Sequence, residues 1–343
     1  MQRIGRYRLV RRIGAGSFAT VWLGRDEDLD VDVAVKILAD NWATNEDVRS
    51  RFISEARLMR RIRDERIVRV YDVGTLPDGR PYFVMDYCDT GSLSDLRRSP
   101  TDPVRALRLC AEACRALEAL HRHRIVHRDV TPGNLLLDTN PDGSVRVLLA
   151  DLGVAKEMVG QQTMTMTAGT PAFMAPEQAT GGALGPWSDI YAMGCVTHAV
   201  LTGHPPFVVK TVNDVMARGA HEVPEPLAAA LGAPPLLDEL LRAALALDPA
   251  HRPRSAAVMA GALDQVADAM GARAGAKAPS PPPPTPPVPS APPVQPVLPT
   301  PSSPVSPEAS LPPTTPAWQF WTLVVLIAML VFIGVMFLTL IAI

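Results

Sequence analysis

The sequence predicts an α+β fold with two lobes, a β-rich lobe over about residues 7–88 and a helical lobe over about residues 91–265. Three observations predict this division. Short β-type runs dominate the first part, apolar residues at helical spacing dominate the second, and the proline content rises abruptly after residue 277. The 343 residues suffice for a two-lobed core plus an appendage, because single cores stop growing at roughly 250 to 300 residues.

The first lobe is predicted to be a sheet with one helix. Residues of β type mark five strands, which we expect over residues 7–10, 20–24, 31–38, 67–73 and 81–85. The helix is expected over residues 46–63, where Phe52, Met59 and Ile62 share one apolar face that would turn toward the core.

In the second lobe, apolar residues recur at helical spacing, for example over residues 104–120 and 236–245. The first of these stretches contains Cys110 and Cys114, one turn apart, which either share a metal ion or are small apolar residues on a buried helix face. We expect burial, because a free cysteine behaves as a small hydrophobe. The four cysteines are too scattered for a disulfide framework.

The overall charge argues against one class of partner. The formal net charge is −2 and the pI is about 6.4, whereas a nucleic-acid surface needs a strongly basic face. We therefore expect no nucleic-acid partner. The first twelve residues contain several arginines without a following apolar run, so they are not a signal peptide and the two lobes are expected in the cytoplasm.

The last part of the chain is predicted to be a spacer and a membrane anchor. Residues 271–317 are assigned to a disordered linker, because about half of residues 279–316 are proline, which favours a semi-rigid polyproline II spacer. Its Pro-x-x-Pro stretches would alternatively be recognised by a binding domain. Residues 320–343 carry no charge, and about 20 apolar residues cross a bilayer as a helix. They are predicted to form one transmembrane helix, with a buried core helix as the less favoured alternative.

Three motifs in a fixed order carry the chemistry. Lys36 ends the run Val-Ala-Val-Lys, His-Arg-Asp ends at Asp129 with Asn134 five residues later, and Asp-Leu-Gly begins at Asp151. Two carboxylates and an amide at this spacing supply a base for a hydroxyl group and oxygen ligands for magnesium, while the lysine neutralises phosphate charge. The order of the motifs indicates phosphoryl transfer from ATP.

Together with the glycine-rich run 13–21, these motifs resemble the signature set of protein kinases. Over residues 7–265 the chain is identified as a member of the bacterial eukaryotic-like (Hanks-type) Ser/Thr protein kinases. The resemblance implies a two-lobed protein kinase fold, ATP with Mg²⁺ or Mn²⁺, and transfer of the γ-phosphate to Ser or Thr hydroxyls of proteins. Autophosphorylation between two copies would need a homodimer. With the anchor, a single-pass signalling kinase of the cell membrane is expected.

The resemblance also assigns roles to the motif residues. Asp129 would accept the proton of the substrate hydroxyl, and Asn134 and Asp151 would bind the metal ions. Lys36 would bridge the α- and β-phosphates of ATP, with the carboxylate of Glu55 holding its ammonium in place.

An ATP site is implied between the lobes. Glycines let backbone amides approach the phosphates closely, although Ala19 stands where relatives have a third glycine. Met85 would be the gatekeeper, and adenine would bond to the Asp86 carbonyl and the Cys88 amide. The full implied set is Ile13, Gly14, Gly16, Val21, Ala34, Lys36, Glu55, Met85, Asp86, Cys88 and Leu136.

Residues 156–174 resemble an activation segment. Thr163, Thr165 and Thr167 are candidate phosphorylation sites, because a phosphothreonine would recruit Arg128 through charge-assisted hydrogen bonds. A polar loop without modification is the alternative. Thr170 matches the threonine that bonds the catalytic aspartate in Ser/Thr kinases.

Three further residues are implied to be structural supports of the second lobe. Glu177 and Arg252 match a buried ion pair of the family, and Asp189 matches the aspartate that holds the backbone of the catalytic loop.

Besides Ala19, three positions depart from the family pattern. Thr131 replaces a lysine that touches the γ-phosphate, which leaves a catalytically weak or inactive pseudokinase, acting as a nucleotide-binding scaffold at the membrane, as the alternative function. Leu152 replaces a phenylalanine and is expected to pack beneath the helix, alongside Met59. Arg124 replaces a glycine at a helix end, where a left-handed backbone would cost roughly 1 kcal/mol or more.

Overall fold

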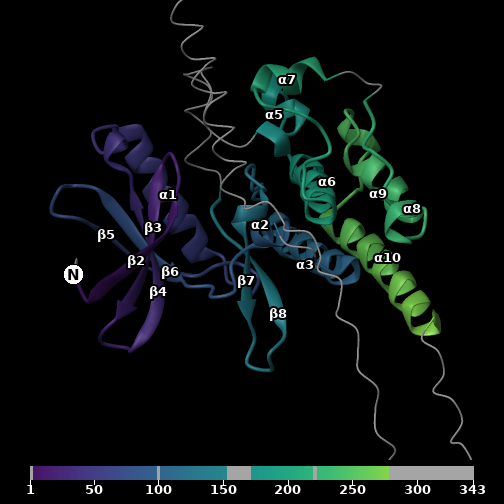
Figure 1. The fold of residues 1–343 in the computed structure, drawn as a ribbon. Helices are drawn as coiled ribbons and strands as arrows, with labels where there is room; N and C mark the ends of the chain where they lie inside the picture. The colour runs from purple at the N-terminus through teal and green to yellow at the C-terminus, as the bar shows by residue number, and fades with distance from the viewer. Residues whose placement is uncertain (1–2, 99–100, 153–170, 219–221, 278–343) are drawn as a thin grey trace, which may run out of the picture. The chain divides into compact units, whose positions relative to one another are not determined.

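The first lobe is built on a six-stranded sheet in the order β1-β2-β3-β4-β6-β5, in which all neighbours are antiparallel. The computed structural model in Figure 1 describes residues 3–98, 101–152, 171–218 and 222–277, with the backbone alone over 274–277. The strands of this sheet are β1 (Arg3–Ile4), β2 (Tyr7–Ala15), β3 (Ala19–Asp26), β4 (Val31–Leu38), β5 (Val70–Thr75) and β6 (Pro81–Asp86).

Helix α1 (Glu46–Arg61) packs against strands β5 and β6 (Figure 1). The side chain of Asn45 caps its first turn by accepting a hydrogen bond from the Val48 amide at 3.1 Å. Its buried face includes Phe52, whose ring centroid lies 5.0 Å from that of Phe83 in β6. The helix ends two residues before the predicted residue 63, because Ile62 adopts an extended backbone and is itself buried.

The segment between α1 and β5 joins the two lobes. A strand was predicted over residues 67–73, but β5 begins only at Val70. Ile67 forms a parallel bridge with Leu149 instead, the Val68 amide donates to the Leu149 carbonyl at 3.0 Å, and the Leu149 amide donates to Arg66 at 2.8 Å. The predicted start is therefore wrong, because this part of the run pairs with a strand of the second lobe.

The second lobe is mostly helical and surrounds α6 (Pro186–Thr202), in which residues 188–200 are all buried. A helix that is buried all round forms a core, and α6 contacts α3, α9 and α10. The other elements are α2 (Leu93–Leu96), α3 (Pro103–Arg122), β7 (Leu135–Thr139), β8 (Val145–Leu149), α5 (Pro176–Thr180), α7 (Val212–Ala217), α8 (Ala228–Leu231), α9 (Leu236–Ala244) and α10 (Ala256–Lys277), with 3₁₀ helices η1 (Asp40–Trp42), η2 (Pro132–Asn134), η3 (Pro171–Phe173) and η4 (Pro249–His251).

Cys110 and Cys114 are fully buried on α3. Burial raises the pKa of the Cys110 thiol to about 12 and that of Cys114 well above its ordinary value. Among the described residues there is no cluster of three or more side chains that could hold a metal ion. The expected burial of these cysteines is thus confirmed.

Helix α10 continues to Lys277, past the predicted domain end at residue 265 and into the range assigned to the linker. The reason is local: residues 271–277 are rich in alanine, and the first proline comes only at residue 279. The rest of the linker and the predicted membrane helix, 320–343, lie outside the described residues. Within the described ranges, no helix combines the length and apolarity needed to span a bilayer.

Glu177 and Arg252 form a buried bidentate pair in the second lobe. The two guanidinium nitrogens donate to the two carboxylate oxygens at 2.7 and 2.9 Å, and the Ser188 hydroxyl donates to Glu177 at 2.8 Å. Burial alone would raise the pKa of Glu177, but the bonds from Arg252 and Ser188 outweigh it and hold that pKa below its ordinary value. The pair fixes the start of α5 to the chain before α10.

Arg124 ends helix α3 in the left-handed conformation, with φ of 59°. Its amide donates to His121 at 2.8 Å, and the Ile125 amide donates to Leu120 at 3.4 Å, which together make a Schellman motif. A glycine is the usual residue at this position, because it has no Cβ to clash. The side chain of Arg124 is exposed.

We predict that Arg124→Gly raises the free energy of unfolding by about 0.5 to 1 kcal/mol, because relief of the left-handed strain, roughly 1 to 2 kcal/mol, exceeds the entropy cost of glycine. Urea denaturation measures the change. The control is His123→Gly at the neighbouring residue, whose φ is −83°; it should lower stability. A loss of stability in Arg124→Gly would show that the cap is unstrained.

Candidate active site

Lys36 lies at the centre of a buried cluster of charges. Its Nζ is 3.0 Å from Oε1 of Glu55 and 2.9 Å from Oδ1 of Asp151. Strand β4 supplies the lysine, helix α1 the glutamate, and the chain after β8 the aspartate. Lys36 and Glu55 are only 8% and 2% exposed, so salt and water screen them little. The sheet, α1 and the second lobe therefore meet at one ammonium group.

Burial and charge act in opposite directions on this cluster. Removal from water lowers the pKa of Lys36, but the carboxylates of Asp151 and Glu55 outweigh that effect and the pKa is raised above its ordinary value. Burial raises the pKa of Glu55 to about 7 despite the opposing charge of Lys36. Lys36 is therefore protonated at neutral pH.

Asn134 holds the side chain of Asp129 in the catalytic loop. Its Nδ2 donates to Oδ2 of Asp129 at 2.9 Å and to the Asp129 carbonyl oxygen at 2.8 Å. The 3₁₀ helix η2 turns the chain so that Asn134 faces back onto this loop. The Asn134 carbonyl also accepts from the Ala150 amide at 2.9 Å, which ties the loop to the residue before Asp151.

A buried aspartate of α6, Asp189, holds the backbone of the same loop. Its Oδ2 accepts from the His127 amide at 2.8 Å and its Oδ1 from the Arg128 amide at 2.9 Å. The His121 ring Nε2 lies 2.7 Å from Oδ2. Asp189 was predicted from the sequence but His121 was not, because nothing in the local sequence indicates a contact between α3 and α6. These bonds hold Arg128 at a left-handed φ of 66°.

His127 connects the catalytic loop to Asp151. Its Nδ1 accepts from the Asp129 amide at 3.3 Å, so its Nε2 carries the proton and donates to the Ala150 carbonyl at 3.0 Å. The ring is fully buried. Asp151 follows with a left-handed φ of 55°, a conformation that costs on the order of 1 to 3 kcal/mol outside glycine and persists only when its surroundings enforce it.

Two departures from the family pattern, Leu152 and Thr131, lie next to these residues. Leu152 is 2% exposed and belongs to the same core cluster as Met59 of α1, as expected. Thr131 is half-buried and begins η2 with an extended backbone. The leucine therefore fills the core below α1, whereas the threonine brings no positive charge to the loop.

The residues expected around the nucleotide lie mostly on adjacent strands of the sheet. Val21 of β3 pairs with Gly14 of β2 on one side and with Lys36 of β4 on the other. Ala34 of β4 pairs with Met85 of β6. From the second lobe, Leu136 of β7 bridges to Ser92, just after the segment that links the lobes. Ile13 is 37% exposed at the end of β2 that leads into the Gly14–Gly16 turn.

Asp86 and Cys88 lie where the chain passes from the first lobe to the second. The Asp86 carboxylate accepts hydrogen bonds from the Arg69 amide at 2.8 Å and from the Tyr71 hydroxyl. Its side chain is therefore already bonded to residues at the start of β5. Burial raises the pKa of the half-buried Cys88 thiol to about 12, so this thiol is protonated. For hydrogen bonding to a ligand, the backbone of both residues is the relevant part.

Asp151 and Asn134 supply one carboxylate and one amide oxygen, the hard oxygen ligands that Mg²⁺ or Mn²⁺ prefers. They fit such an ion in chemistry. The activation-segment residues Thr163, Thr165 and Thr167 and also Thr170 lie outside the described residues.

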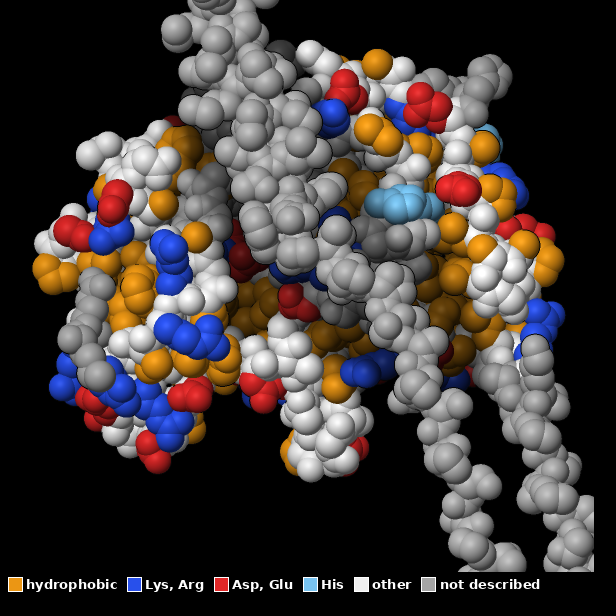
Figure 2. All heavy atoms as spheres, in the orientation of Figure 1, with side chains coloured by type: hydrophobic (Ala, Val, Ile, Leu, Met, Phe, Trp, Pro, Cys, Tyr) orange, Lys and Arg blue, Asp and Glu red, His pale blue; other side chains and the backbone are white. Residues whose placement is uncertain are grey.

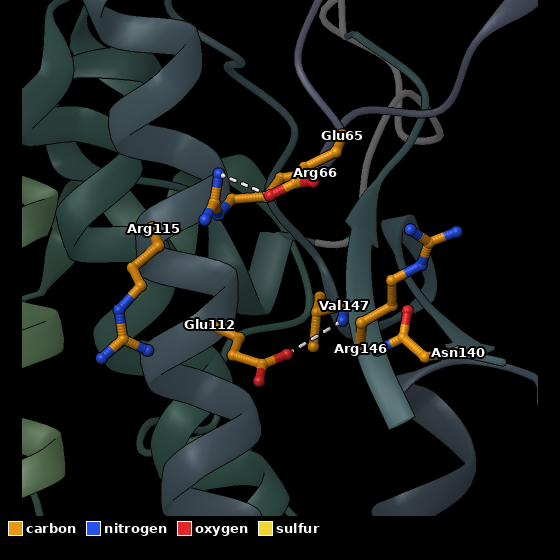
Figure 3. Close-up of a pocket in the computed structure, with 7 residues that line it drawn as sticks. All are labelled: Glu65, Arg66, Glu112, Arg115, Asn140, Arg146 and Val147. Atoms are coloured by element: carbon orange, nitrogen blue, oxygen red, sulfur yellow. Dashed lines mark hydrogen bonds and ion pairs between the residues drawn. The ribbon is translucent and has the colours of Figure 1, made fainter. Parts of the chain in front are cut away.

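A cavity of about 380 Å³ lies elsewhere, between α3, β8 and residues 65–66 (Figure 3). Its arginines are already paired, since Arg146 contacts Asp138 at 2.7 Å and Arg115 contacts Asp264. Glu112 points from α3 to β8, where it accepts from the Val147 amide at 3.1 Å. No residue of the Lys36 cluster lines this cavity, so it is separate from the candidate active site.

The chain is similar to curated serine/threonine-protein kinases. The DNA damage-responsive serine/threonine-protein kinase RqkA of Deinococcus radiodurans is 38% identical over 262 residues, which cover 75% of this chain and 39% of that protein. Serine/threonine-protein kinase PknB of Mycolicibacterium smegmatis is 37% identical over 264 residues, covering 74% and 42%. The chain thus spans about two fifths of the length of these relatives.

Among solved structures, the kinase domain of Mycobacterium tuberculosis PknI is similar, with a TM-score of 0.60 and 26% identity over 77% of this chain and 97% of that one. Residues 7–262 match the family model described as protein kinase domain. Fold, site geometry and sequence match together show that the chain belongs to the protein kinase family.

Proposed function

We propose that the protein is an ATP-dependent Ser/Thr protein kinase that phosphorylates itself and other proteins. The observation that carries this proposal is the placement of Lys36 at 3.0 and 2.9 Å from Glu55 and Asp151, with Asp129 held by Asn134 at 2.9 Å in the adjoining loop. These are the groups that phosphoryl transfer needs, and the curated relatives are named serine/threonine-protein kinases.

The residues have separable roles in the proposed reaction. Lys36 has three N–H donors, of which Glu55 and Asp151 take two, so one donor is left for an oxygen of the α- or β-phosphate. Asp129 accepts the proton of the incoming hydroxyl, and its bond from Asn134 fixes the direction in which it does so. Asp151 and Asn134 would hold Mg²⁺ or Mn²⁺, which neutralises charge on the phosphates.

Regulation and partners follow from the same proposal. Phosphorylation of Thr163, Thr165 or Thr167 would place a dianion near Arg128, whose backbone Asp189 already fixes. Trans-autophosphorylation would bring two copies together. Proteins are the proposed substrates and nucleic acid is not a proposed partner; on the face shown in Figure 2, acidic and basic side chains lie interspersed over the first lobe.

A second candidate is a pseudokinase that binds nucleotide without transferring phosphate. Thr131 favours it, because the family pattern has a lysine there that would stabilise charge in the transition state. The complete set of Lys36, Glu55, Asp129 and Asp151 favours an enzyme.

Asp129→Asn separates the two candidates. With labelled ATP and Mg²⁺, the wild-type chain should label itself on threonine, and the variant should lose label by about 10²- to 10⁴-fold, the usual contribution of a general base, while nucleotide affinity is retained. The matched control is Asp142→Asn, in the exposed turn between β7 and β8, which should label normally. A wild-type chain that binds nucleotide but stays unlabelled would establish the scaffold.

We also propose that residues 320–343 anchor the protein in the cell membrane as a single-pass helix, with the kinase domain in the cytoplasm. The uncharged apolar run and the proline-rich segment before it support this. The availability of ATP on the cytoplasmic side supports this orientation.

A chain that ends at Lys277 should therefore move from the membrane pellet to the soluble fraction and still label itself, because it retains the whole of α10. Deletion of residues 281–310 alone shortens the spacer but keeps the apolar run, so that variant should remain in the pellet. Cell fractionation with immunodetection measures the distribution. Persistence of the shortened chain in the pellet would contradict the proposed anchor.

A further inference from the structure

Trp42 contacts the tip of the glycine-rich loop. It belongs to η1, the short 3₁₀ helix that follows β4, and its indole Nε1 donates to the Ser17 carbonyl at 2.9 Å. Its ring stacks on that of Phe18, with centroids 5.3 Å apart and an interplanar angle of 20°. From the same segment, the Ala39 amide donates to the Phe18 carbonyl at 2.9 Å. Two consecutive carbonyls of the loop are therefore held from residues 39–42.

Fixing the Ser17 carbonyl also fixes the orientation of an amide. The Ser17 carbonyl and the Phe18 N–H belong to one planar trans peptide, in which the two groups point in opposite directions. With the carbonyl directed at Trp42, the Phe18 N–H must point away from Trp42. The Ala39 bond imposes the same condition on the next peptide, between Phe18 and Ala19.

The rest of the tip is equally constrained. Phe18 is 9% exposed and belongs to the main core cluster, so its ring anchors the loop on the side of Trp42. The Gly16 amide donates to the Ala19 carbonyl at 2.9 Å and closes the turn. Among the described residues, the amides of Ser17 and Phe18 have no hydrogen-bond partner. The loop thus presents two amide donors from an ordered backbone.

We propose that Trp42, with the Ala39 amide, is a positioning residue for phosphate binding. It holds the tip of the glycine-rich loop so that the Phe18 amide, beside that of Ser17, is directed at phosphate oxygens of the nucleotide before it arrives. Ordering the loop in advance removes an entropy cost from binding, and amide donors of this kind suit anionic oxygens. The inference rests on the proposed binding of ATP in this cleft.

A role in packing alone would have different consequences. If Trp42 only filled space between the loop and the core, its loss would loosen the first lobe and weaken every ligand of the cleft alike. If it orients the loop amides, its loss lowers the affinity for a ligand only in proportion to the number of phosphates that the ligand carries. ADP and adenosine share the base and ribose and differ only in the diphosphate, so they distinguish the two cases.

The test is direct titration of the full chain with ADP and with adenosine, in which isothermal titration calorimetry measures each dissociation constant. Trp42→Phe keeps an aromatic ring against Phe18 but removes the indole N–H donor. It should lower the affinity for ADP by about 2- to 10-fold, the range that corresponds to one hydrogen bond, and leave the affinity for adenosine unchanged. The matched control is Trp22→Phe in β3, because Trp22 is half-buried and its indole has no hydrogen-bond partner among the described residues.

A second variant covers the case in which Trp42→Phe does not fold. Ala39→Pro removes the amide that binds the Phe18 carbonyl, and the φ of −71° at Ala39 is compatible with proline. It should show the same selective loss of ADP affinity. Equal weakening of ADP and adenosine, or no change in either, would overturn the inference. A wild-type chain that binds neither ligand would instead contradict the proposed function.

Discussion

The structure depends on keeping the ammonium group of Lys36 charged in a place from which water is almost excluded. Burying an isolated ammonium is costly, and the cost is met only when carboxylates approach it closely. Glu55 and Asp151 do so at 3.0 and 2.9 Å. One comes from α1 and the other from the second lobe, so the electrostatic requirement of a single residue fixes the relative position of three elements.

In the second lobe, helix α6 is a rigid support for the catalytic loop. Helix α6 is buried along most of its length, and from it Asp189 accepts two backbone amides of the catalytic loop at 2.8 and 2.9 Å. The His127 ring then donates a hydrogen bond to the Ala150 carbonyl at 3.0 Å, which ties the catalytic loop to the residue before Asp151. The left-handed backbones of Arg128 and Asp151 are retained because these bonds enforce them. Two of the four non-glycine residues with left-handed backbones among the described residues therefore lie at the candidate active site, and the other two are Asp30 and Arg124.

Much of this could be predicted from the sequence, for a physical reason. The residues of the catalytic loop lie within a few positions of one another, so their spacing in the chain determines their spacing in space, and the apolar periodicity of residues 46–63 predicts α1. Contacts between segments that lie far apart in the chain have no corresponding pattern in the local sequence. Neither the bond between His121 and Asp189 nor the contact of Trp42 with Ser17 has a local signal. Residues 67–68 have the composition of a strand and pair with β8 rather than with the sheet. Helix α10 extends past the predicted domain end because the alanines after residue 265 favour continuation of the helix.

The most direct test of the central claim is a double-mutant cycle on the free energy of unfolding, with Glu55→Gln, Asp151→Asn and the two combined. If both carboxylates hold one buried ammonium, either alone still compensates it in part, and removal of both leaves it unpaired. The double variant should then lose at least about 1 kcal/mol more than the sum of the single losses. Losses that add within about 0.5 kcal/mol would mean that the two contacts are independent and that Lys36 does not join the lobes.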